Sequence, residues 1–75
     1  MNARQLKLIR LFSGLTQKEF AQEIGVAENT LAKCEASIIE VSTATKAKVL
    51  RKYDLSDPEF IEFTKRMTAS EKLPE

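Results

Sequence analysis

The stretch Leu15-Thr16-Gln17-Lys18-Glu19-Phe20-Ala21-Gln22-Glu23-Ile24-Gly25-Val26 decides the fold of this chain. It opens with a capping box, in which the Thr16 hydroxyl accepts a hydrogen bond from the Glu19 amide and the Glu19 carboxylate accepts one from the Thr16 amide. A helix therefore begins here, and Gly25 ends it because glycine readily adopts the left-handed conformation that closes a helix. The buried face expected of this helix consists of Phe20, Ala21 and Ile24.

A second short helix, from Ala27 to about Ala36, follows that glycine after a turn of only a few residues. Helical spacing places Leu31 and Cys34 on its inward side. Its outward side carries Glu28, Asn29, Ala32 and Lys33. Two short helices joined so tightly around Gly25 must cross steeply, which is the geometry of a helix-turn-helix.

Three further helices are predicted around this motif. One covers Asn2 to Phe12 and ends at Ser13-Gly14, one runs from a cap at Ser42 or Thr43 to Tyr53, and one begins at Asp57-Pro58-Glu59 and ends near Met67. We therefore expect an all-α, compact five-helix domain over residues 1–67, followed by a flexible C-terminal tail over residues 68–75. The side chains expected to face inward are Leu6, Leu8, Ile9, Leu11, Phe12, Ser13 and Leu15 at the first of these helices, Ala47, Val49, Leu50 and Tyr53 at the second, and Phe60, Ile61, Phe63, Thr64 and Met67 at the third.

The composition is typical of one compact helical domain. With 75 residues, of which 43% are hydrophobic and 31% charged, the chain can bury a single core whose stability is marginal. No apolar run approaches membrane-spanning length, and Lys7 and Arg10 interrupt what would be the hydrophobic region of a signal peptide. We therefore expect a cytoplasmic protein without a membrane partner.

Histidine is absent, and Cys34 is the single cysteine. Without histidine the chain lacks the commonest general base and the commonest metal ligand, so we expect no catalytic residue, metal site, cofactor or small-molecule substrate. Enzymatic function is therefore not expected. Cys34 is most simply a small core residue, whereas the alternative role of a redox sensor needs an exposed thiol of low pKa.

Three parts of the sequence carry a family resemblance: Arg10, the run from Leu15 to Val26, and the run Thr30-Leu31-Ala32-Lys33-Cys34-Glu35. Together they resemble the lambda-repressor-like family, also called the Cro or xenobiotic-response-element type. The likeness covers roughly two thirds of the chain. Members of that family are transcriptional regulators, so the resemblance implies a phage-like repressor that binds double-stranded DNA. It also implies that the helix over residues 27–36 is the recognition helix in the major groove, while the helix before it crosses the DNA backbone.

The resemblance also assigns roles to single residues. It implies that Glu28, Asn29 and Lys33 reach base edges, that Gln17, Thr16 and Thr30 contact phosphates, and that Arg10 and Glu35 form an interior ion pair. Elementary chemistry agrees, because Asn can bond adenine at two positions, Lys can donate to guanine and Glu can accept from cytosine. Gln17 stands at a helix N-terminus, where free amides suit a phosphate oxygen.

Most of these roles have a plainer alternative. A carboxylate such as Glu28 stabilises the first turn of any helix, and Gln17 suits any capped helix start. Asn29 and Lys33 are ordinary surface side chains if the motif is set aside. Arg10 lies on an inward stripe, where an unpaired charge is costly, so an ion pair is favoured over an isolated charge.

The chain departs from the family pattern after the recognition helix. Family members commonly carry glycine and basic residues there, whereas this chain has Ser37-Ile38-Ile39-Glu40-Val41. The net charge of +1 is also low for a nucleic-acid binder, although Lys46, Lys48, Arg51 and Lys52 give the fourth helix a basic surface. Two hypotheses therefore stay open. The chain binds DNA, as two copies on half-sites about one turn apart, or it is a protein-interaction module that binds another regulator through Ile38 and Ile39 or through the fifth helix.

Overall fold

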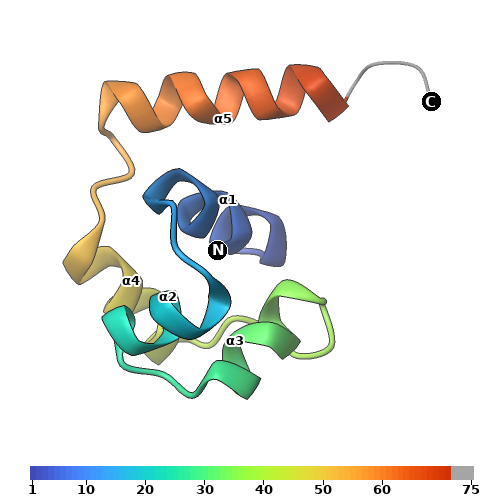
Figure 1. Cartoon of the computed structure of the whole chain (residues 1–75), viewed down its shortest axis with the longest axis vertical. Helices are drawn as coiled ribbons and strands as arrows, with labels where there is room; N and C mark the ends of the chain where they lie inside the picture. Colours follow the sequence, from blue (N-terminus) through green and yellow to red (C-terminus); the bar gives the residue numbers. More distant parts are fainter. Residues whose placement is uncertain (72–75) are drawn as a thin grey trace.

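The computed structural model describes residues 1–71 and shows, over these residues, five helices joined by short turns and loops (Figure 1). The helices are α1 (Ala3–Ser13), α2 (Gln17–Ile24), α3 (Glu28–Glu35), α4 (Thr43–Lys52) and α5 (Pro58–Glu71). The all-α, five-helix fold expected from the sequence is confirmed.

Local chemistry determines where α1 and α2 begin and end. At α2, the Glu19 amide donates to the Thr16 hydroxyl at 3.1 Å and the Thr16 amide donates to the Glu19 carboxylate at 3.0 Å, so the expected capping box is present. Asn2 and Gln5 form a second capping box at the start of α1. Both helices end at glycines with left-handed backbones, Gly14 at φ 75° and Gly25 at φ 81°. These positions favour glycine because other residues strain there.

The apolar core lies where α1, α2 and α3 meet, with one buried apolar residue each from α4 and α5. In Figure 1, α1 lies between α5 above it and the crossed pair of α2 and α3 below it, and α1 contacts both α3 and α5. The buried faces expected for α2 and α3 are confirmed. The core comprises Leu6, Ile9, Phe20, Ala21, Ile24, Leu31, Cys34, Val49 and Phe60.

Four apolar residues expected to face inward are instead exposed, namely Leu11, Ala47, Leu50 and Ile61, and those inward placements were wrong. Ile61 borders an open hollow between α1 and α5. In α4, the side chains that face the core are Thr45 and Val49, one turn apart. Ala47 and Leu50 lie off that line and are exposed, since among the described helices α4 packs mainly on α2. In α1, Leu11 borders an open hollow between Glu35 of α3 and Met67 of α5 and is likewise exposed.

Helix α5 packs on α1 through aromatic side chains and is longer than expected. The Phe12 ring lies 5.3 Å from that of Phe60 and 5.4 Å from that of Phe63. The helix continues past Met67 to Glu71 because residues 68–71 contain no helix breaker. The Arg4 guanidinium also donates to the Thr68 hydroxyl at 3.2 Å. Residues 72–75 of the expected tail lie outside the described residues.

Ser37, just after the end of α3, has a backbone conformation that is strained for residues other than glycine. Ser37 has φ 60°, the left-handed conformation, and is the only non-glycine residue with positive φ among residues 1–71. Its amide donates to the Cys34 carbonyl at 3.1 Å and the Ile38 amide to the Lys33 carbonyl at 2.9 Å, the bond pattern of a Schellman motif. Serine thus occupies a position that usually holds glycine.

Replacement of Ser37 by Gly is expected to raise the free energy of unfolding by about 0.5–1 kcal/mol. Relief of the left-handed strain exceeds the added flexibility of the unfolded chain. Urea denaturation followed by circular dichroism measures the change. The matched control is Ala36→Gly, at φ −84°, which is expected to destabilise by about the same amount. A loss of stability for both variants would show that Ser37 is not strained.

Candidate nucleic-acid interface

Helix α3 presents a polar face opposite its buried one. Leu31 and Cys34 are at most 1% exposed, while Glu28, Asn29 and Lys33 are exposed. Asn29 and Lys33 are four residues apart and therefore lie on one side of the helix. Within residues 1–71, no hydrogen bond or ion pair engages the side chains of these three polar residues. They are available to an external partner.

The start of α2 is built around the Thr16 cap. The Thr16 hydroxyl accepts the Glu19 amide, and hydrogen bonds from the Thr16 backbone and then its side chain hold the pKa of the Glu19 carboxyl below its ordinary value. Both side chains are exposed. The cap therefore fixes the conformation of the first turn of α2 and satisfies its Glu19 amide, while the amides before it have no partner within the helix.

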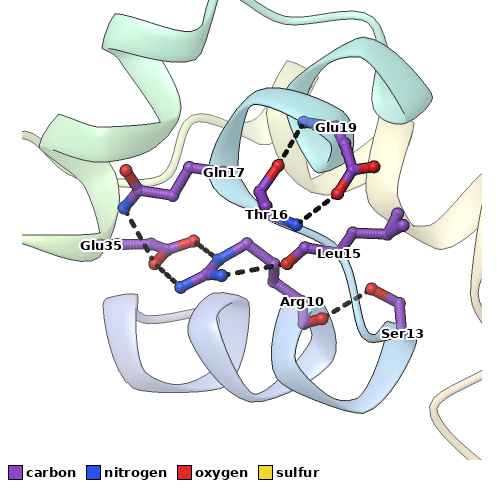
Figure 2. A network of polar contacts seen from close by, with 7 residues as sticks. All are labelled: Arg10, Ser13, Leu15, Thr16, Gln17, Glu19 and Glu35. Atoms are coloured by element: carbon purple, nitrogen blue, oxygen red, sulfur yellow. Dashed lines mark hydrogen bonds and ion pairs between the residues drawn. The ribbon is translucent and has the colours of Figure 1, made fainter.

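A polar network joins α1, α2 and α3 (Figure 2). The Arg10 guanidinium donates to both oxygens of the Glu35 carboxylate, with Nε to Oε2 at 2.7 Å and Nη2 to Oε1 at 2.9 Å. Its remaining Nη1 donates to the Leu15 carbonyl at 3.1 Å. The side chains of Arg10 and Glu35 are only 13% and 4% exposed. The interior ion pair that the resemblance implies is present.

Gln17 belongs to this network as well. Its Nε2 donates to Glu35 Oε1 at 3.3 Å, and the residue is half-buried. Sequence reasoning placed Gln17 on a phosphate and missed this internal contact, because the two residues are 18 positions apart and only the crossing of α2 and α3 brings them together. One of the two Nε2 hydrogens stays available for an external acceptor.

The loop between α3 and α4 is exposed and apolar. Ile38 is 70% exposed and Ile39 is 42% exposed. Together with Met1–Ala3, residues 37–41 line an open hollow of about 340 Å³. Glu40 is exposed in the same loop. No basic side chain lies among residues 37–41 to neutralise a phosphate.

Two of the four basic residues on α4 are turned toward α2. Lys48 Nζ donates to the Gly25 carbonyl at 3.1 Å, and Lys52 Nζ lies 4.0 Å from the Glu23 carboxylate. The Lys48 contact stabilises the C-terminal end of α2, where the helix dipole favours a cation. These two lysines therefore act within the fold, while Lys46 and Arg51 are exposed.

Cys34 is a core residue. It is 1% exposed, and its Sγ lies 3.8 Å from the Glu40 carbonyl. Burial, with a smaller effect of the Glu35 charge, raises the pKa of the thiol. This position therefore does not provide the exposed thiol of low pKa that a redox sensor needs.

Residues 1–71 hold no group of three or more acidic, histidine or cysteine residues that could bind a metal ion. None of the described helices has the length and apolar character needed to cross a membrane.

Comparison with known proteins identifies the family. A helix-turn-helix domain model matches residues 3–63, which span most of the chain and include all of α1 to α4. This match agrees with the lambda-repressor-like resemblance of the sequence. Comparison with curated proteins gives no significant match, and neither does comparison with solved structures. The chain therefore belongs to the helix-turn-helix domain family, whose fold indicates a DNA-binding regulator.

Proposed function

We propose that this chain is a sequence-specific transcriptional repressor that reads the major groove of DNA with α3. The observation that carries the proposal is the outward face of α3, where Glu28, Asn29 and Lys33 are exposed and have no side-chain partner among residues 1–71. A recognition helix needs this arrangement, with one face packed into the core and polar tips free to reach base edges.

The three side chains suit different bases. Asn29 can accept from adenine N6 while it donates to N7, Lys33 can donate to guanine O6 and N7, and Glu28 can accept from cytosine N4. Phosphate contacts come from Gln17, Thr16 and Thr30 together with the free amides at the start of α2. Glu28 and Glu40 repel phosphates, so non-specific binding should be weak and base contacts should carry a large share of the affinity.

The size of the chain suits binding of two copies side by side. Half-sites of helix-turn-helix dimers lie about 34–36 Å apart, one turn of DNA. The chain measures 34 × 27 × 21 Å along its principal axes. These dimensions are comparable with the spacing of the half-sites, which supports binding of two copies on adjacent turns of the duplex.

A second candidate function is that of a module that binds another regulatory protein. The exposure of Ile38 and Ile39 beside the hollow at Met1–Ala3 favours this alternative. The two functions differ in their response to salt, since DNA affinity falls steeply as salt rises and an apolar protein contact barely changes.

Three alanine variants test the assigned contacts. Lys33→Ala and Asn29→Ala are each expected to weaken binding at the cognate site by about 1–3 kcal/mol and to relax discrimination at one base pair. Gln17→Ala is expected to weaken binding to all duplexes by similar factors. Fluorescence anisotropy against the cognate duplex and single-base variants measures these changes. Equal losses on every duplex for Lys33→Ala would contradict its role as a base contact.

A further inference from the structure

Hydrogen bonds from Arg10 of α1 and Gln17 of α2 hold the Glu35 carboxylate in place. Its two oxygens accept from Arg10, and Oε1 also accepts from Gln17 Nε2. The carboxylate is 4% exposed and Arg10 is itself held by the Leu15 carbonyl. Figure 2 shows the three side chains converging from α1, α2 and α3. Glu35 can therefore hold the Gln17 amide in one orientation.

That orientation matters because Gln17 is the first residue of α2. A glutamine side chain at a helix start otherwise samples several rotamers, and ordering it on binding costs free energy. With one Nε2 hydrogen on Glu35, the second stays available to an external acceptor such as a phosphate oxygen.

We infer that Glu35 is a positioning residue for DNA binding, because its carboxylate, clamped by Arg10, orders the Gln17 amide that meets a phosphate. Neither Arg10 nor Glu35 touches the DNA in this arrangement. The Gln17–Glu35 contact also links the last turn of α3 to the first residue of α2. It therefore fixes the position of the phosphate contact relative to the helix that reads the bases. The inference rests on the proposed DNA-binding function.

Two charge-neutral double variants separate positioning from folding. Arg10→Met with Glu35→Gln keeps a carbonyl oxygen that can accept from Gln17, whereas Arg10→Met with Glu35→Met removes that acceptor. Neither leaves a buried charge unpaired, so both are expected to fold. Each double variant is also made with Gln17→Ala. Thermal denaturation confirms folding, and titration with one 20-base-pair duplex measures affinity.

With Gln17 present, the Glu35→Met double variant is expected to bind about fivefold more weakly than the Glu35→Gln double variant, the effect of one ordered hydrogen bond. With Gln17→Ala added, the two are expected to bind equally. A purely structural role of Glu35 would leave the same difference in both backgrounds and would overturn the inference. Equal binding with Gln17 present would overturn it as well.

A measurement without DNA tests the ordering step directly. The order parameter of the Gln17 side-chain amide, from NMR relaxation of the free protein, is expected to be lower in the Glu35→Met double variant than in the Glu35→Gln double variant. Equal order parameters would overturn the inference. Failure of the unmodified chain to bind any duplex would instead overturn the proposed function, and with it the role of Glu35 in DNA binding.

Discussion

Glu35→Ala is expected to lower the free energy of unfolding by about 3–5 kcal/mol. The variant leaves the Arg10 guanidinium, 13% exposed, with the Leu15 carbonyl as its remaining acceptor. A buried cation without its counterion loses the interaction that offset its desolvation. The free energy of unfolding of so small a domain is only marginal, so the loss is a large fraction of it. Urea denaturation at 10 °C, where a destabilised variant still folds in part, measures the change.

Two controls show whether burial causes the loss. Glu23→Ala removes one partner of the exposed Lys52–Glu23 pair, whose side chains are about half exposed and 4.0 Å apart, and is expected to cost at most about 0.5 kcal/mol. The paired replacement of Arg10 and Glu35 by Met is expected to recover most of the stability. If Glu35→Ala costs no more than Glu23→Ala, the interior pair does not stabilise the fold.

Phe20→Ala is the second variant with a large expected effect, a loss of about 3–5 kcal/mol. Phe20 is fully buried, and its ring centroid lies 5.5 Å from that of Tyr53. It is the largest of the fully buried side chains in the core. Its truncation removes apolar contacts and leaves a cavity between α2 and its neighbours, which the short helices can fill only in part.

The matched control for Phe20 is Leu50→Ala, an apolar truncation on α4 at a side chain that is 45% exposed. It is expected to change stability by about 0.5 kcal/mol or less. Phe20→Leu, which keeps most of the volume, is expected to cost less than Phe20→Ala. Urea denaturation of all three variants provides the comparison. Similar losses for Phe20→Ala and Leu50→Ala would contradict the core described above.

The parts of the fold that the sequence predicts correctly depend on local chemistry. The capping box at Thr16 and the helix end at Gly25 involve groups within a few residues of one another, so both can be recognised in the sequence. The buried faces of α2 and α3 follow from helical spacing within eight residues. The helix-turn-helix could therefore be assigned before the structure.

The parts that the sequence does not predict depend on packing between distant elements. Leu50 is as apolar as a core residue, and only the position of α4 on α2 decides that it is exposed. The Gln17–Glu35 contact has no local signal either. The sequence gives no signal for the left-handed conformation of Ser37, because glycine usually marks such a position and serine stands there instead. At the candidate site, sequence pattern predicts which residues point outward, and the base each one contacts stays a prediction.

The most direct test of the central claim is a fluorescence titration of the unmodified chain. The ligands are genomic duplexes, including the DNA upstream of its own reading frame, at 50 mM and 200 mM salt. DNA binding by α3 predicts at least one fragment bound sequence-selectively at low salt, with affinity that falls severalfold at high salt. Absence of any sequence-selective fragment at 50 mM salt would contradict the claim and favour the protein-binding alternative.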